Sequence, residues 1–297
     1  MGTSIEVNEQ SAPQIFCDRR RTAYRNRAGY RIIARDGFAD QFLWQHIADE
    51  LRERLMAVSR DFEHILIIGP LAHLAQHIIA DRSVTVTCAA LCDAERSKDA
   101  LLFDSEDRLP IANESYDVII TAGTLDSVND LPGALIQMRR SLRPDGLLLA
   151  TLFGAGTLSA LKSAMMSAAP DMVQPHIHPQ IDIRQAADLL QRAGFTIPVA
   201  DVDGVDIAYR DWRRLVDDLR DMGVGNALMG GRRYLGRGFP AQLDKAWHAM
   251  ADNNGRVRER FSLLHLSGWS PSPDQPKPAQ RGSATMSLAA ALGAKPL

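Results

Sequence analysis

The stretch YDVIITAGTLDSVNDLPGALIQMRRSLRPDGLLLATLF, residues 116–153, contains two strongly apolar runs separated by an amphipathic segment. The runs YDVIIT (116–121) and LLLATLF (147–153) have the length and aliphatic content of buried strands. Between them, residues 131–142 show a helical pattern that ends at RPDG (143–146), where Pro and Gly stop a helix. The stretch therefore predicts a strand–helix–strand unit.

The same alternation extends toward the N-terminus. HILIIGPLAHLA (64–75) contains the apolar run Ile65–Ile68 directly before a glycine, which predicts a first strand, followed by a helix over residues 70–80. Val84–Ala90 predicts a second strand, and Ala100–Phe103 predicts a third. Apolar strands separated by helices are typical of a parallel sheet covered on both faces, so the predicted fold class is α/β.

Two helical segments precede this alternation. Residues 16–38 are rich in arginine and predict a basic helix exposed to solvent; the alternative is a docking surface for an acidic partner or an RNA phosphate. Residues 39–58 predict an amphipathic helix whose apolar stripe consists of Phe42, Leu43, Ile47, Leu51, Leu55 and Met56.

The pattern changes after residue 153. Phe195–Val202 and Val205–Tyr209 predict two strands, and Asp203-Gly204 between them is a hairpin turn signal. Ser262–Trp269 is a late apolar stretch, and residues 223–239 predict a loop. Helices are predicted over residues 158–169, 186–193, 211–222 and 240–252.

The amino-acid composition argues against several classes of function. The net charge of −2 argues against bulk binding of nucleic acid, which needs a basic excess. The three cysteines, Cys17, Cys88 and Cys92, lack zinc-site spacing and fit a reducing compartment. No apolar run is long enough for a membrane span, and the first residues lack the pattern of a signal peptide. We therefore expect a cytoplasmic protein with no nucleic-acid partner.

Several motifs carry a resemblance to a known family. Leu109-Pro110 before the fourth predicted strand and Leu142-Arg143-Pro144-Asp145-Gly146 before the fifth resemble the class I S-adenosylmethionine-dependent methyltransferases. Further blocks narrow the resemblance to the methyltransferase-like complex I assembly factor 5 family, the arginine hydroxylases, and its bacterial relatives. These blocks are Phe153-Gly154, Gly156-Thr157-Leu158, Pro175-His176-Ile177, Arg192-Ala193-Gly194-Phe195, Asp221-Met222-Gly223, Ser267-Gly268-Trp269 and Arg281-Gly282-Ser283-Ala284.

The resemblance implies both a fold and an activity. The fold is Rossmann-like, with a mainly parallel seven-stranded sheet, a C-terminal antiparallel hairpin and added helices. Residues 1–38 would form an N-terminal arm, 39–210 the methyltransferase-like domain, and 211–297 a helical extension and tail packed on the same domain. The implied cofactor is S-adenosylmethionine, and the implied substrate or partner is a protein, a subunit of respiratory complex I.

The predicted cofactor site departs from the family pattern. Gly69 is the one glycine left in the loop after the first strand, where Pro70 removes an amide donor. Ala90 stands where the family has the acidic residue for the ribose, and Ser105 stands at the adenine position between Asp104 and Glu106. The predicted cofactor contacts are Gly69, Asp104, Ser105, Glu106 and Thr121.

Two hypotheses for the function stay open. In the first, the protein is an enzyme that modifies a protein side chain, with Asp126 as the candidate general base or guanidinium ligand. In the second, it is a non-catalytic assembly or binding module with a vestigial cofactor pocket. A small-molecule carboxyl methyltransferase is a lesser third possibility. No metal site is predicted, because His176 and His178, near Asp182, are expected to form hydrogen bonds in a loop instead.

Overall fold

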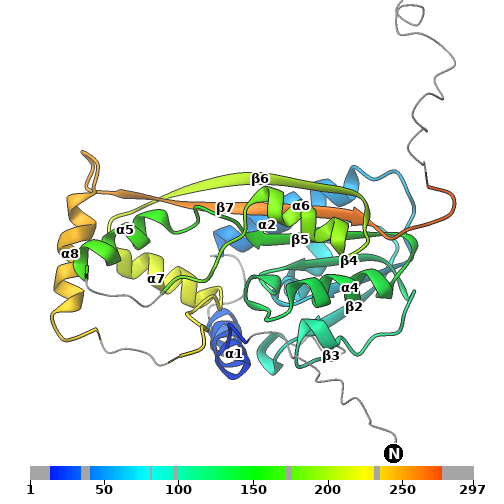
Figure 1. Cartoon of the computed structure of the whole chain (residues 1–297), viewed down its shortest axis with the longest axis horizontal. Coiled ribbons are helices and arrows are strands. Elements are labelled where there is room, and N and C mark those ends of the chain that lie inside the picture. The colour runs from blue at the N-terminus through cyan, green and yellow to red at the C-terminus, as the bar shows by residue number, and fades with distance from the viewer. Residues whose placement is uncertain are drawn as a thin grey trace, which may run out of the picture.

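The structure is a computed structural model that describes residues 14–34, 41–80, 82–95, 100–170, 176–230 and 235–275. Its centre is a seven-stranded sheet with the order β3-β2-β1-β4-β5-β7-β6 (Figure 1). Six strands run in the same direction, and β7 is antiparallel to its two neighbours, β5 and β6. The strands are β1 (His64–Ile68), β2 (Thr85–Ala90), β3 (Leu101–Leu102), β4 (Tyr116–Ala122), β5 (Leu142–Phe153), β6 (Thr196–Tyr209) and β7 (Val257–Trp269). The predicted α/β class with a mainly parallel sheet is confirmed.

Helices cover both faces of this sheet. Alternate residues of β1 show why: Ile65 and Ile67 pack in one apolar cluster, while Leu66 and Ile68 pack in the other. The first cluster is covered by α2 (Phe42–Met56), α3 (Ala75–Ile79), α5 (Ser159–Ala168), α7 (Trp212–Asp221) and α8 (Phe239–Ala249), and the second by α4 (Leu131–Ser141) and α6 (Ile183–Arg192). Such two-faced burial requires strands that are apolar on both sides. None of the described helices has the length and hydropathy of a membrane span.

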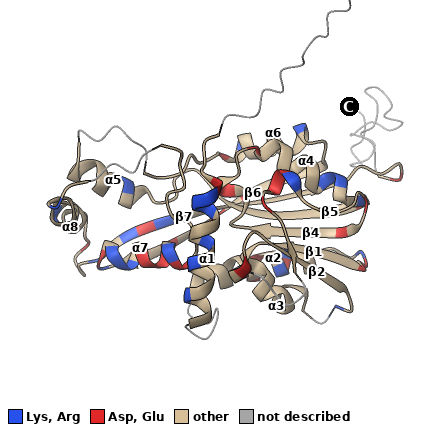
Figure 2. Cartoon of the chain, turned by 90° about the horizontal axis from the view of Figure 1, so that it is seen from below, with Lys and Arg blue, Asp and Glu red and all other residues tan. Residues whose placement is uncertain are grey.

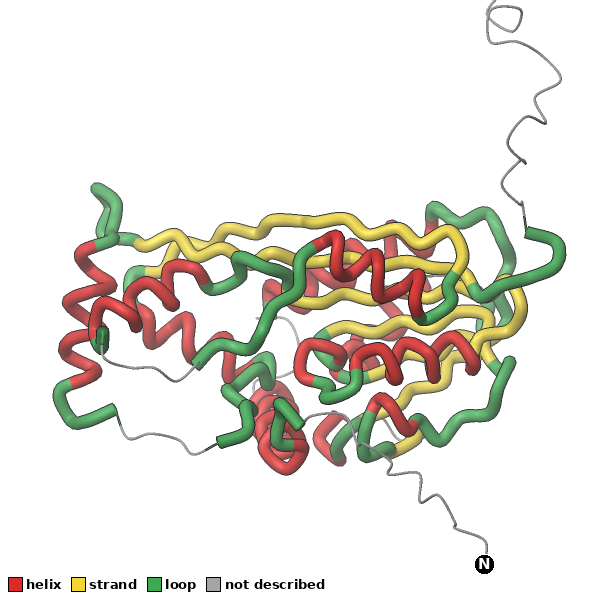
Figure 3. The backbone as a smooth tube through the Cα atoms, viewed as in Figure 1, coloured by secondary structure: helices red, strands yellow, loops and turns green. Residues whose placement is uncertain are grey.

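The predicted hairpin at Asp203-Gly204 is wrong. Figure 3 shows β6 as one unbroken strand, and both residues pair with β7, Asp203 opposite Leu263 and Gly204 opposite Ser262. A Cβ atom on Gly204 would lie 2.4 Å from the guanidinium of Arg260. The glycine therefore accommodates a crossing side chain and forms no turn. The antiparallel pair at the sheet edge is made by β6 and β7.

Two other predictions need correction in detail. In α2, Leu43, Ile47, Leu51 and Leu55 are buried as expected, but Phe42 and Met56 are exposed at the helix ends. The RPDG segment does end α4, yet it also begins β5, where the pairing register with β4 shifts between Tyr116 and Val118. The RGSA motif at 281–284 lies outside the described residues.

The arginine-rich segment forms α1 (Asp18–Ala34), which crosses the carboxyl ends of the strands. It was predicted to be a solvated helix, but one stripe of it is buried: Arg21, Arg25, Ala28, Gly29 and Ile32. The close approach is visible at Gly29, where a Cβ atom would lie 2.6 Å from the Cβ of Ala94. The prediction of a solvent-exposed helix is therefore wrong for this face of α1.

Candidate functional site

In the loop after β1, the glycine at position 69 is required for steric reasons. Gly69 has a φ of +85°, which side chains rarely adopt, and a Cβ atom there would lie 2.3 Å from the Cγ2 of Thr124. The following residues, Pro70–Leu74, form a 3₁₀ turn in which Leu71 is fully buried. The loop is thus packed closely against the segment after β4.

The predicted contacts after β2 and β3 have different environments. Ala90, at the end of β2, is fully buried and offers no polar side chain for a ribose. Asp104 is exposed, and Ser105 is half-buried with its hydroxyl bonded to the Asp107 carboxylate. Glu106 is fully buried. The structure therefore does not bring the acidic residues of this segment together as a ligand site.

The partner of Glu106 is Arg21 of α1. The Nη2 of Arg21 donates to both carboxylate oxygens of Glu106, at 2.7 and 2.9 Å, and its Nε donates to the Ser127 hydroxyl at 3.0 Å. Burial lowers the pKa of Arg21, but the interactions with Glu106 and, to a lesser extent, with Asp18 together outweigh burial and raise the pKa above its ordinary value. Arg21 therefore stays charged, and it joins the ends of β3 and β4.

A second arginine of α1 lies closer to the first strand. Arg25 is 5% exposed and donates to the carbonyl oxygen of Gly123. A Cβ atom on Gly69 would lie 3.8 Å from Nη1 of Arg25. Figure 2 shows the basic residues of α1 where the helix crosses the strand ends. The two arginines thus fill the edge where the sequence predicts the cofactor.

Thr121 is part of the same closed edge. Its side chain is fully buried, and its hydroxyl lies 2.6 Å from the Thr124 hydroxyl and donates weakly to the carbonyl of Ile68 at 3.4 Å. Together with Ala90, Arg21 and Arg25, this arrangement does not fit S-adenosylmethionine. Ala90 offers no carboxylate to bind the ribose hydroxyls, and the side chains of Arg21 and Arg25 occupy the strand ends.

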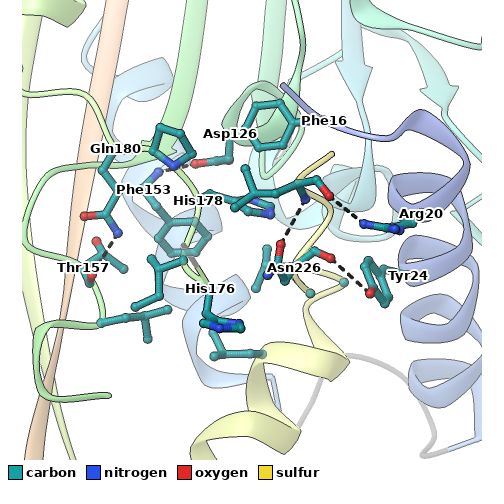
Figure 4. Close-up of a pocket in the computed structure, with 18 of the residues that line it drawn as sticks. Phe16, Arg20, Tyr24, Asp126, Phe153, Thr157, His176, His178, Gln180 and Asn226 are labelled. Carbon is teal, nitrogen blue, oxygen red and sulfur yellow. Dashed lines mark hydrogen bonds between the residues drawn. The ribbon is translucent and has the colours of Figure 1, made fainter. Parts of the chain in front are cut away.

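A large cavity of about 1230 Å³ lies beside this edge, at the carboxyl ends of β4 and β5 (Figure 4). Asp126 lines it, as do Phe16 from the chain before α1 and Phe153 at the end of β5. None of the five predicted cofactor contacts belongs to its lining. The open space of the site is therefore displaced from the predicted cofactor position.

Asp126, which lines this cavity, has a pKa that is shifted toward neutral pH. Its Oδ1 accepts the backbone N–H of Phe153 at 2.5 Å, and its Oδ2 is buried without a hydrogen-bond partner among the described residues. Burial raises the pKa of Asp126 to about 6, although the Phe153 amide and Arg25 oppose this shift. An unpartnered buried oxygen is costly, and a ligand donor could reach this one once the side chain turned toward the cavity.

Residues of α1 and of the segment after α7 form another wall of the cavity. Arg20 donates to the carbonyls of Leu228 and Gly230 at 2.6 and 2.9 Å, and the hydroxyl of Tyr24 donates to the carbonyl of Asn226 at 3.2 Å. These contacts, drawn in part in Figure 4, connect α1 to the segment after α7. The four-residue spacing of Arg21 and Arg25 ahead of Gly29 is the feature of the sequence that could have identified the buried face of α1.

His178 is a hydrogen-bonded loop residue, as expected. Its Nε2 accepts the N–H of Ala227 at 3.0 Å, and its ring lies edge-on to Phe16, with centroids 4.9 Å apart. Burial, aided by the charge of Arg21, lowers the pKa of His178 to about 4. The ring is therefore neutral, and its bonded nitrogen holds the loop against the cavity wall.

Comparisons with known proteins agree with this architecture. A family model described as a methyltransferase domain matches residues 43–198. The arginine-hydroxylase NDUFAF5, mitochondrial, of Mus musculus is 30% identical over 261 residues, which cover 83% of this chain and 76% of that protein. A malonyl-[acyl-carrier protein] O-methyltransferase of Xylella fastidiosa is 35% identical over 176 residues, 59% of each chain.

A solved structure supports the fold alone. The YcgJ protein of Bacillus subtilis aligns with a TM-score of 0.51 at 11% identity, and the alignment covers 76% of this chain and 99% of that one. At this identity the two chains share an arrangement of strands and helices, and the likeness carries no argument about ligands.

Proposed function

The chain belongs to the methyltransferase domain family, and from this premise we propose that it is an assembly factor of respiratory complex I that binds a protein partner without S-adenosylmethionine. The relatives named arginine-hydroxylase support a role on a protein, and the resemblance to the complex I assembly factor 5 family supports the choice of partner. The site must then explain how the protein binds its partner without a cofactor.

One observation carries this proposal: Arg21 and Arg25 fill the strand ends at which the family holds its cofactor. Arg21 is bound by a buried carboxylate, and removing it would leave that charge unpaired, which is expensive in a protein interior. Ligand binding at this edge would have to displace both side chains, and nothing at Ala90 would replace the lost ribose contact. The closed edge therefore favours a binding module.

The cavity beside the edge fits an arginine side chain of the partner. Asp126 offers an oxygen without a partner among the described residues, and Phe16 and Phe153 offer apolar surface for the stem of the side chain. A guanidinium prefers a carboxylate that can accept two parallel bonds and an aromatic surface on which to stack. Because the pKa of Asp126 is raised to about 6, binding of a guanidinium should strengthen as pH rises through 6.

The second candidate is an enzyme that modifies the bound arginine. Asp126 also favours this function, since a carboxylate whose pKa is near 6 can accept a proton close to neutral pH. The two candidates differ in one requirement: the enzyme must hold a cofactor, and α1 would have to leave the strand ends for it to bind.

Calorimetric titration of the whole chain with S-adenosylmethionine and S-adenosylhomocysteine distinguishes the two. We expect no heat with either compound, and we expect binding of an arginine-containing peptide that is lost in Asp126→Asn. A peptide with citrulline in place of arginine is the matched control and should not bind. Micromolar binding of S-adenosylmethionine that is lost in Gly69→Ala would contradict the binding-module proposal and favour the enzyme.

A further inference from the structure

A second polar site lies away from the strand ends, between α2 and the antiparallel strands. His46, Glu50 and Arg54 follow one another at one-turn intervals on the face of α2 that meets β6. His46 Nε2 lies 2.6 Å from Oδ2 of Asp203, and Arg54 bonds both carboxylate oxygens of Asp201, at 2.8 and 3.1 Å. Glu50 therefore lies between two contacts that join the helix to the strand.

Three side chains in this layer are close enough to share one ion. One ligand atom each from His46, Glu50 and Asp203 lies within 4.8 Å of the other two. All three side chains are about one-third exposed, so an ion could reach them from solvent. Arg54 uses only Oε2 of Glu50, at 3.3 Å, which leaves the second oxygen of that carboxylate for another contact.

A buried histidine beneath the cluster gives an independent indication of a ligand. His265 of β7 is 2% exposed and pairs with Asp201 of β6 on one side and with Thr151 of β5 on the other. Its Nδ1 bonds the Thr151 hydroxyl at 3.0 Å, so Nε2 points away from β5, and Nε2 has no partner among the described residues. The side chains of Arg54, Asp201, Asp203 and His46, all members of the same layer, lie near enough to interact electrostatically with this ring.

From this geometry we propose that His46, Glu50 and Asp203 bind a divalent transition-metal ion, with the buried His265 facing the ion or a water that it holds. One imidazole and two carboxylates suit Zn²⁺ and its neighbours in the first transition row better than Mg²⁺, which prefers oxygen ligands alone. A solvent molecule on the ion would give His265 Nε2 the partner that it lacks. The ion would connect α2 to β6, so its role is structural and independent of the proposed function.

Titration of the whole chain with Zn²⁺ tests this site, and the chain contains a matched control. His77 Nε2 lies 2.6 Å from Asp49 Oδ1, the same distance as in the His46–Asp203 pair, but none of the described residues joins this pair as a third ligand. We expect one Zn²⁺ per chain, affinity reduced about tenfold or more in His46→Ala and in Asp203→Asn, and no change in His77→Ala. Bound Co²⁺ should show the visible absorption of a tetrahedral site, and His265→Phe should alter it.

Two outcomes would overturn the proposal: no Zn²⁺ binding by the unmodified chain, or binding that is equal in all variants. If His46→Ala or Asp203→Asn fails to fold, Glu50→Gln keeps the test open, because Glu50 is partly exposed on a helix and the substitution preserves its shape. Far-ultraviolet circular dichroism of each variant separates loss of a ligand from loss of structure. Mg²⁺ in place of Zn²⁺ should produce no binding at this site.

Discussion

The carboxyl ends of β1–β3 and those of β4–β5 lie side by side in one sheet, yet they have opposite characters. At the first group, Arg21 of α1 pairs with the buried Glu106 after β3, and Arg25 covers Gly69 after β1 while it donates to the carbonyl of Gly123 after β4. At the second, Asp126 lines a cavity of about 1230 Å³ with one buried oxygen unpartnered among the described residues. One edge of this fold is therefore closed by side chains of the protein, while its neighbour borders an open cavity.

The closing element is the N-terminal helix, and its fit has a sequence basis. Gly29 lets the backbone of α1 approach Ala94, and Asn26 accepts the N–H of Ala94 at 3.3 Å. This approach brings Arg21 and Arg25 within reach of the strand ends. If one member of a buried hydrogen-bond network is removed, its partner is left without a hydrogen bond in a medium of low dielectric constant. Such a network therefore resists opening.

The largest expected effect is at the closed edge. Arg21→Ala should lower the free energy of unfolding by about 3–5 kcal/mol, because it leaves the buried carboxylate of Glu106 without its cation. Urea denaturation measures the loss. Arg60→Ala, which breaks an exposed ion pair with Asp145, is the control and should change stability far less. A double variant with Glu106→Gln that is as unstable as the sum of the single variants would contradict the pairing.

A change at the open edge should act in the opposite direction. In the folded chain the pKa of Asp126 is about 6, against 3.8 as its ordinary value, so the unfolded chain releases this proton first as pH rises. Asp126 therefore costs stability progressively from about pH 4 to about pH 6, and the full cost persists above that range. Asp126→Asn should stabilise the protein at pH 7 by on the order of 2–3 kcal/mol and should have little effect below pH 4. Urea denaturation at both pH values measures this, and equal effects at the two would contradict the raised pKa.

Gly69→Ala should destabilise the protein by about 1–3 kcal/mol, because a Cβ atom would strain the backbone at φ +85° and meet Thr124. Thermal unfolding measures the cost. Gly156→Ala is the matched control: it also has a positive φ, but nothing lies within 4 Å of its Cβ position. Equal losses in the two variants would show that Thr124 does not contribute.

The smallest expected effect is at Thr121, which was predicted to contact the cofactor but is enclosed in the sheet. Thr121→Val should cost about 1 kcal/mol through the hydrogen bond to Thr124, and it should leave the binding of an arginine peptide unchanged. Urea denaturation and peptide titration of the same variant measure both. A large loss of peptide affinity would mean that the two edges are coupled.

Local sequence patterns could predict the sheet but not the environment of its charged residues. Ile65–Ile68 and YDVIIT predicted strands, since an unbroken apolar run must be buried on both faces. Asp203-Gly204 predicted a turn and was wrong, because pairing with β7 along the whole of β6 overrides a local preference for turning. The arginines of α1 were predicted to face solvent, since charged residues are rarely buried without a partner.

The sequence by itself determined the order of strands and helices, the family, and the absence of an acid at Ala90, because these depend on residues that are close together in the chain or on direct resemblance. Only the tertiary structure decided what occupies the predicted cofactor edge. Arg21 and Glu106 are 85 residues apart, and so are paired only once α1 lies across the strands. The same holds for His46 and Asp203, 157 residues apart. Burial and charge pairing between distant segments depend on packing, which no local pattern specifies.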